Sequence, residues 1–143
     1  MRIINLNPDT DFGASAWFVE IDGHRLLMDA GVHPKLDGHA SLPLYSAIAR
    51  EEVEAIALSH CHHDHVGSLP LAIRRFPKAH VFMTDLSYFI VERVLHNSVN
   101  VMKRQREESN IPGYPLYTHE ELDEIAPLFQ GFIHKHQFIA HLA

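Results

Sequence analysis

The stretch SHCHHDHVGSLP, residues 59–70, places three histidines and one carboxylate in the pattern His-x-His-x-Asp-His. It follows an apolar run at residues 53–58 and precedes a helix-like segment at residues 69–76. We interpret these as a buried strand, a tight ligand loop and a helix. Side chains two residues apart in an extended backbone point to the same side, so His60 and His62 can converge on one metal ion.

Asp64 and His65 come where the chain turns into the helix, and they can converge on a second point nearby. Imidazole suits zinc, and a carboxylate can complete or share a zinc site. Two metal ions a few Å apart can clamp both oxygens of a displacement reaction and generate hydroxide at neutral pH. The sequence therefore predicts that His60, His62, Asp64 and His65 are metal ligands and that Asp64 is catalytic. The alternative is a histidine-rich surface loop.

The motif resembles the signature of the metallo-β-lactamase fold, and its continuation Gly67-Ser68-Leu69-Pro70 narrows the resemblance. Lactamases and glyoxalase-type hydrolases usually carry Gly-Gly there. The segment Asp-His-x-Gly-x-Leu-Pro resembles the β-CASP nucleases, which include RNase J and the endonuclease of messenger RNA 3′-end processing. The resemblance covers about residues 12–130. It implies an α/β fold, the N-terminal half of an αββα sandwich, with a mixed sheet flanked by helices.

The same resemblance implies a chemistry. Its members are zinc-dependent enzymes that cleave RNA phosphodiester bonds with a hydroxide held by two zinc ions. His60 and His62 would hold one zinc ion, and Asp64 and His65 the other. Two other functions stay open: another hydrolase of this fold, acting on a thioester, lactone or lactam, or a non-catalytic metal-binding module. The sequence does not distinguish RNA from DNA as substrate, or endonuclease from exonuclease action.

A second segment, Asp29-Ala30-Gly31, also resembles the β-CASP family. It follows two predicted strands, residues 15–21 and 24–29, which Asp22-Gly23 joins as a hairpin. In the family the aspartate of this segment braces the metal loop, so the resemblance implies that Asp29 orients a ligand. From the residues alone, a turn or cap aspartate before a glycine is an equal alternative.

Other polar residues have simpler interpretations. Cys61 and His63 alternate away from the ligand side and are expected to pack or to support the ligands. His33 is expected to cap a turn rather than touch substrate. His80 lies in an apolar strand and is expected to be a core or edge residue. His134 and His136 share a strand face; they are expected to be solvated, and a further metal site is the less favoured alternative.

The remaining pattern predicts alternating strands and helices. Pro34, Gly38 and Pro43 mark a long connection, and a short helix is expected at residues 43–49. Further strands are predicted at residues 1–5, 79–83 and 131–138, and helices at 85–108, capped by Thr84 or Asp85, and at 118–125, opened by a capping box. The long helix has apolar residues at helical spacing, which predicts a buried stripe of Leu86, Phe89, Ile90, Val94 and Val101, widened by Val91 and Leu95.

Composition limits the function less than the motif does. The 143 residues have a net charge of −6, so no basic patch indicates nucleic acid, although bound metal ions can supply local positive charge. The single cysteine excludes an internal disulfide and fits a reducing compartment. No signal-peptide core or membrane-spanning run is apparent. A cytoplasmic protein without a membrane partner is the expectation.

The sequence contains fewer ligands than a two-zinc site needs. Relatives supply a further histidine, a bridging aspartate and a last histidine from the second half of the domain, and residues 139–143 do not match the expected Ala-Gly-His segment. We therefore interpret residues 1–143 as a partial domain, a fragment or truncated product without the second half or a capping domain. Such a chain is expected to bind metal weakly, to have little activity, and to expose a sheet face that favours homo-oligomers.

Overall fold

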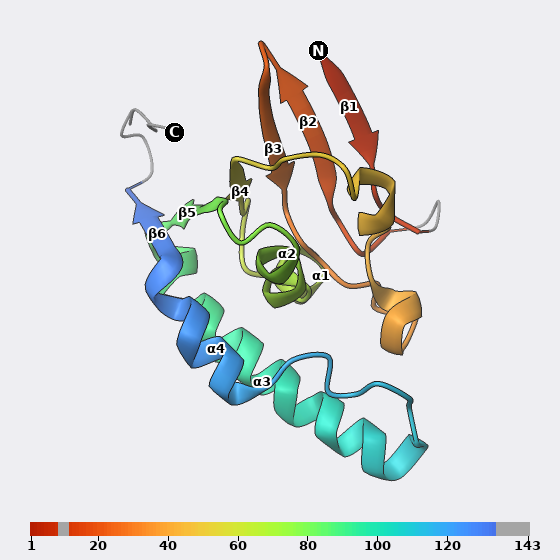
Figure 1. The fold of residues 1–143 in the computed structure, drawn as a ribbon. Coiled ribbons are helices and arrows are strands. Elements are labelled where there is room, and N and C mark those ends of the chain that lie inside the picture. The colour runs from red at the N-terminus through yellow and green to blue at the C-terminus, as the bar shows by residue number, and fades with distance from the viewer. Residues whose placement is uncertain (9–11, 134–143) are drawn as a thin grey trace.

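A single mixed sheet forms the frame of the molecule (Figure 1). The computed structural model describes residues 1–8 and 12–133. The six strands lie in chain order across the sheet, and they are β1 (Arg2–Asn5), β2 (Trp17–Ile21), β3 (His24–Met28), β4 (Ala55–Ala57), β5 (His80–Thr84) and β6 (Phe129–Phe132). β1 to β3 pair antiparallel, whereas β3 to β6 pair parallel. The predicted α/β class with a mixed sheet is confirmed.

The hairpin between β2 and β3 forms where the sequence predicts it. Asp22 and Gly23 have φ angles of 51° and 83°, and Ile21 pairs with His24 across the turn. Two successive residues with positive φ are what a two-residue type I′ turn needs, and its twist matches that of the strands. The hairpin thereby sets the register that carries the backbone to Asp29.

Helices fill the crossovers between the parallel strands. They are α1 (His63–Val66), α2 (Leu69–Arg75), α3 (Asp85–Ser109) and α4 (His119–Ile125). The Thr84 hydroxyl accepts the Ser87 backbone N–H, and the Thr118 hydroxyl accepts the Glu121 N–H, so both helix starts have their predicted caps. Three short 3-10 helices complete the elements: η1 (Gly38–Ser41), η2 (Tyr45–Ile48) and η3 (Ala126–Leu128).

Some predicted boundaries are wrong. The strand expected at residues 53–58 is limited to Ala55–Ala57, and the helix expected at 43–49 is the single 3-10 turn η2. The last strand begins at Phe129, two residues before the predicted start, and ends at Phe132. The predicted positions His134 and His136 lie outside the described residues.

The predicted buried stripe of α3 is wrong in part: Val91 and Leu95 are buried as expected, whereas Leu86, Phe89, Ile90 and Val101 are exposed. Leu86 and Phe89 are 76% and 77% exposed, and the buried row consists of Ser87, Val91, Leu95, Ser98, Val99 and Met102. A prediction from apolar residues alone misses part of the buried face, because Ser87 and Ser98 occupy two of its positions. Their hydroxyls have partners, Thr84 for Ser87 and His63 for Ser98, so they are buried without an unpaired group.

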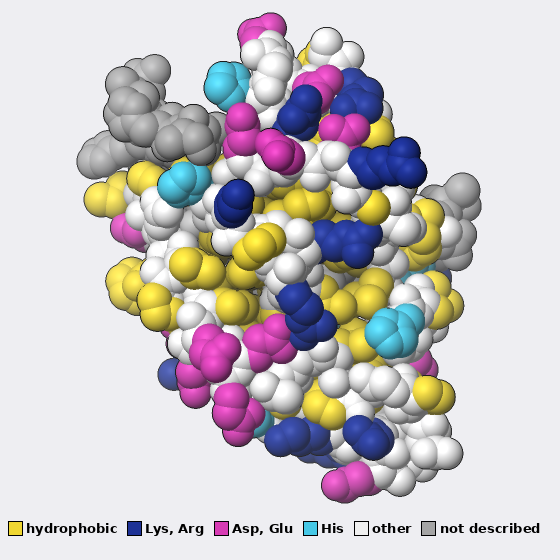
Figure 2. Space-filling view, viewed as in Figure 1, with side chains coloured by type: hydrophobic (Ala, Val, Ile, Leu, Met, Phe, Trp, Pro, Cys, Tyr) yellow, Lys and Arg dark blue, Asp and Glu magenta, His cyan; other side chains and the backbone are white. Residues whose placement is uncertain are grey.

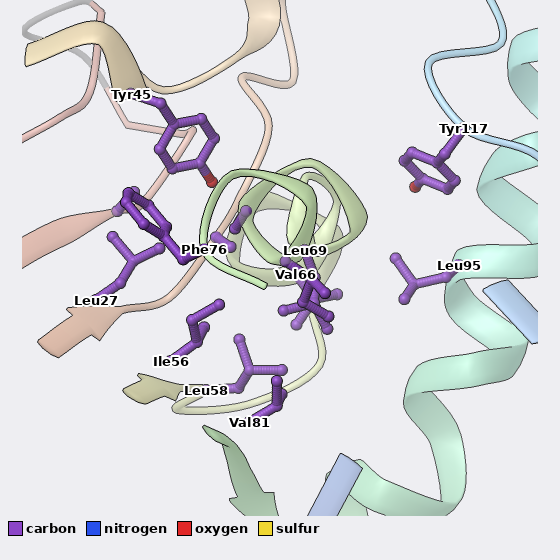
Figure 3. Close-up of a cluster of buried hydrophobic side chains, with 14 of the residues drawn as sticks. Leu27, Tyr45, Ile56, Leu58, Val66, Leu69, Phe76, Val81, Leu95 and Tyr117 are labelled. Atoms are coloured by element: carbon purple, nitrogen blue, oxygen red, sulfur yellow. The ribbon is translucent and has the colours of Figure 1, made fainter. Parts of the chain in front are cut away.

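The α1–α2 segment forms the middle layer of the core (Figure 3). Val66 and Leu69 lie between the sheet residues Leu27 and Ile56 on one side and Leu95 of α3 on the other. All five of these residues are 0% exposed. The ligand loop therefore rests on a segment that is packed from both sides.

The opposite face of the sheet exposes apolar side chains. Ile3, Trp17, Ile21 and Met28 are between 37% and 53% exposed. On β2 and β3 these exposed positions alternate with the buried Phe18 and Leu27. The homo-oligomer expected from such a face stays a prediction. Among the residues that the structure describes, no helix has the length and apolar character to cross a membrane.

Candidate metal centre

The four predicted ligands come together after the end of β4. The His60 ring lies 4.7 Å from the His62 ring and 4.1 Å from the His65 ring, measured between centroids. The Asp64 Oδ2 atom is 3.5 Å from Nε2 of His65. His60 and His62 lie in the connection after the strand, whereas Asp64 and His65 lie on α1, as the interpretation of a strand, loop and helix expects.

Asp29 lies behind this cluster and contacts it directly. Asp29 is 7% exposed, and its Oδ1 accepts the Ser59 backbone N–H at 2.7 Å. Its Oδ2 is 2.8 Å from Nδ1 of His65. A carboxylate only accepts, so Nδ1 of His65 donates, and the neutral ring keeps a lone pair on Nε2. That is the tautomer a metal-ligating histidine needs.

Ser59 extends the same network to His60. The Ser59 hydroxyl donates to Asp29 Oδ2 at 2.9 Å, so its oxygen accepts from Nδ1 of His60, also at 2.9 Å. The Nε2 atom of His60 then carries a lone pair as well. The sequence did not predict a role for Ser59. The one feature that could have indicated such a role is its position directly before His60, the first histidine of the motif.

A close backbone approach fixes α1 against the segment after β3. A Cβ on Gly31 would lie 1.6 Å from the Asp64 carbonyl oxygen, so only glycine fits there. The same carbonyl accepts the Ser15 N–H at 3.0 Å, and Ala30 donates its N–H to the His65 carbonyl at 2.8 Å. The Asp-Ala-Gly segment therefore holds both the side chains and the backbone of the ligand loop.

The donor chemistry of this cluster fits zinc, since it offers two imidazole Nε2 lone pairs and a neighbouring carboxylate. The positions of these donors fit a bound metal ion less well than their chemistry does. Within residues 1–8 and 12–133, no three or more His, Cys, Asp or Glu side chains are arranged so that they could hold a metal ion. The assignment of His60, His62, Asp64 and His65 as ligands, of Asp29 as orienting residue and of Asp64 as catalytic stays a prediction.

The residues between the ligands face other parts of the fold. Nε2 of His63 is 2.8 Å from the Ser98 hydroxyl on α3, and desolvation lowers the pKa of His63 against the opposing charge of Asp64. Cys61 is half-buried and packs against the core. His80 is half-buried at the start of β5, where its ring stacks on Phe82.

A cavity of about 320 Å³ lies between the loop at residues 32–41, α3 and the segment at 114–116. His63 belongs to its wall, so the cavity borders the α1 side of the candidate centre. His33, also in the wall, accepts the Lys35 N–H at Nδ1 as the predicted turn residue would. Its Nε2 is buried without a hydrogen-bond partner.

Charges of both signs are interspersed on the face that Figure 2 shows. Arg2 and Arg25 pair with Glu20 and Glu51, and Arg74 pairs with Glu121 at 2.8 Å. No continuous basic surface is visible among the described residues of this face. Bound metal ions would add positive charge at the candidate centre.

A family model, described as the metallo-beta-lactamase superfamily, matches residues 9–139. The chain belongs to this superfamily. It is 33% identical over 124 residues to the endoribonuclease YSH1 of Candida glabrata. The matched region covers 86% of this chain and 16% of the relative. It is 28% identical over 124 residues to the cleavage and polyadenylation specificity factor 73 of Drosophila melanogaster, covering 86% of the chain and 17% of the relative. The recognised resemblance to RNA-processing nucleases is confirmed.

The solved structure of AidC, a dizinc quorum-quenching lactonase, has the same fold over 87% of this chain and 45% of its own. The TM-score is 0.50 and the sequence identity 19%, so this likeness concerns the fold alone. The architecture is thus part of a metallo-β-lactamase fold, as predicted. The chain spans about one-sixth of the length of the curated relatives that it matches.

Proposed function

We propose that this chain is part of a zinc-dependent nuclease of the β-CASP type that cleaves RNA phosphodiester bonds in the cytoplasm. The observation that carries the proposal is the network of Asp29, Ser59, His60 and His65. It leaves Nε2 lone pairs on two adjacent rings. Similarity to endoribonucleases over 86% of the chain supports RNA as the substrate.

Each residue has a role in this proposal. His60 and His62 hold one zinc ion, and Asp64 and His65 hold the second. Bound zinc supplies Lewis acidity and an activated water molecule at neutral pH. Asp29 fixes the ring of His65 and, through Ser59, the ring of His60, so that neither ligand has to reorient. Gly31 keeps the backbone of α1 close enough for these contacts.

The experiment measures zinc content and RNA cleavage in the same preparations. The chain is expected to bind zinc weakly and to cleave end-labelled RNA slowly, in a reaction that a chelator stops. A His60→Ala, His62→Ala variant should lose both zinc binding and RNA cleavage. The unsubstituted chain should leave a thioester or lactam chromophore intact. Unchanged zinc content in that variant would refute the ligand assignment, and hydrolysis of the chromophore without RNA cleavage would refute the nuclease.

One observation favours a second candidate, a non-catalytic metal-binding module. The described residues do not gather three donors into one site, which is compatible with binding but insufficient for two-metal chemistry. Zinc that depends on His60 and His62, with RNA left uncut at every zinc concentration, would favour this module over the nuclease.

A further inference from the structure

Two histidines outside the candidate centre face each other across neighbouring helices. His96 lies on α3 and His119 is the first residue of α4. Their rings meet edge to edge, with centroids 5.0 Å apart and planes inclined by 15°. The two Nδ1 atoms are 2.7 Å apart, which is within hydrogen-bond distance.

The other nitrogen of each ring lies near an oxygen atom. Nε2 of His119 is 2.9 Å from the side-chain carbonyl oxygen of Asn100, and Nε2 of His96 is 3.5 Å from Oδ1 of Asp123. The Asn100 oxygen accepts from Nε2 of His119, so Nδ1 of a neutral His119 carries a lone pair that faces Nδ1 of His96. A neutral His96 can donate its Nδ1–H to that lone pair. A divalent cation can take the place of this proton and bind both Nδ1 atoms, because the Asp123 oxygen beside Nε2 of His96 favours the tautomer that frees Nδ1.

We propose that His96 and His119 form a binding site for a zinc-like divalent metal ion, ligated through the two Nδ1 atoms. Metal-ligating histidines usually donate their other N–H to an oxygen acceptor, and both rings have such an oxygen, from Asn100 and Asp123. Tetrahedral zinc with bonds of 2.0–2.1 Å needs about 3.3 Å between two nitrogen ligands. The rings separate by about 0.6 Å to admit the ion, and water occupies the remaining positions.

Asn100 and Asp123 each also lie on the same helix face as the histidine of their own helix. Asn100 is four residues after His96 on α3, and Asp123 is four residues after His119 on α4, so each pair shares a helix face. Each histidine, however, contacts the oxygen of the other helix. A metal ion here joins α3 to α4, and it acts on the stability of the helix pair rather than on a substrate. The site shares no residue with the candidate centre and does not depend on the proposed nuclease function.

The test uses the His60→Ala, His62→Ala chain, so that the ligand loop does not compete, and titrates it with zinc chloride. We expect saturable binding of one equivalent by calorimetry and a rise in the unfolding temperature, because zinc binds the folded state. His96→Gln and His119→Gln each keep an Nε2-like donor and remove Nδ1. Both should weaken zinc binding more than tenfold and abolish the rise in unfolding temperature.

Three further variants complete the design. Asn100→Ala and Asp123→Ala should each weaken zinc binding by about tenfold, as loss of an outer hydrogen bond does. His39→Gln, at an exposed histidine elsewhere, should leave binding unchanged. Metal-free unfolding curves check that each variant folds.

Equal zinc affinity in the parent chain, His96→Gln and His119→Gln would overturn the proposal. So would nitrogen-detected NMR that shows a proton shared between the two Nδ1 atoms and retained in saturating zinc. In that case the cation at Nδ1 is a proton rather than a metal ion.

Discussion

Asp29 connects the hairpin to the ligand loop through one carboxylate. It has a φ of 62°, a left-handed conformation that aspartate tolerates better than most residues, and its backbone N–H donates to the Ala57 carbonyl of β4. Its side chain accepts from Ser59 and His65. The strained backbone and the buried carboxylate together place one negative charge directly behind two candidate ligands.

Asp29→Asn is predicted to lower zinc affinity by about 10- to 100-fold, because the amide can present a donor to Nδ1 of His65 and so favour the wrong tautomer. A competitive titration against a chromophoric chelator measures this. Asp22→Asn is the matched control, since asparagine suits the same hairpin turn and Asp22 lies at the opposite end of β3 from Asp29. Equal zinc affinity in wild type and Asp29→Asn would contradict the orienting role.

Gly31→Ala is predicted to destabilise the chain by about 3 kcal/mol or more, because the new methyl group would overlap the Asp64 carbonyl. It should also lower zinc affinity by displacing α1. Gly23→Ala is the control: its Cβ meets nothing within 4 Å, so only the positive φ costs stability, about 1–2 kcal/mol. Urea unfolding gives both values, and a zinc affinity unchanged by Gly31→Ala would show that the loop tolerates this displacement.

At the residue scale, the spacing of His60, His62, Asp64 and His65 at a strand end was enough to predict that their side chains lie near one another. Their role as metal ligands stays a prediction. The sequence did not predict Ser59 as the link between His60 and Asp29. A serine before a motif has no preferred partner until the fold places a carboxylate beside it.

At the scale of elements, α3 shows where periodicity is insufficient. Its start, its cap and its length were close to the prediction, since those depend on local signals. Its buried face was predicted only in part: Val91 and Leu95 are buried, but Leu86 and Phe89 were chosen over Ser87 and Ser98 because they are larger and more apolar. Which face is buried depends on the partner side chains of α1 and α4, and these come from distant sequence.

Leu95→Ala on α3 is predicted to cost about 2–5 kcal/mol, because Leu95 is fully buried against the middle layer. Phe89→Ala should change the free energy of unfolding by no more than about 0.5 kcal/mol, since that ring is 77% exposed. Urea unfolding of the two variants compares the faces directly. A larger loss for Phe89→Ala would mean that another surface covers Phe89.

At the scale of the whole molecule, two buried tyrosines attach the outer layers to the segment that follows the ligand loop. The Tyr117 hydroxyl donates to the Gly67 carbonyl at 2.9 Å. The Ser68 hydroxyl donates to the Gly31 carbonyl, so the Tyr45 hydroxyl donates to Ser68, at 2.8 Å. Both contacts end at the junction of α1 and α2. Desolvation raises the pKa of Tyr117 to about 12 and raises that of Tyr45 as well.

These raised values predict a loss of stability in alkali. Unfolded tyrosine ionises near pH 10, whereas the folded chain keeps Tyr117 neutral up to about pH 12. The stabilisation is therefore complete below about pH 10 and is lost as the pH rises through the folded value. Tyr117→Phe should cost about 1 kcal/mol at pH 8, because the Gly67 carbonyl loses its donor, and should make the alkaline decline shallower. Urea unfolding between pH 8 and 12 measures both effects. Tyr88→Phe, at a ring that is 41% exposed, should change neither, and an equally steep decline in Tyr117→Phe would place the alkaline sensitivity elsewhere.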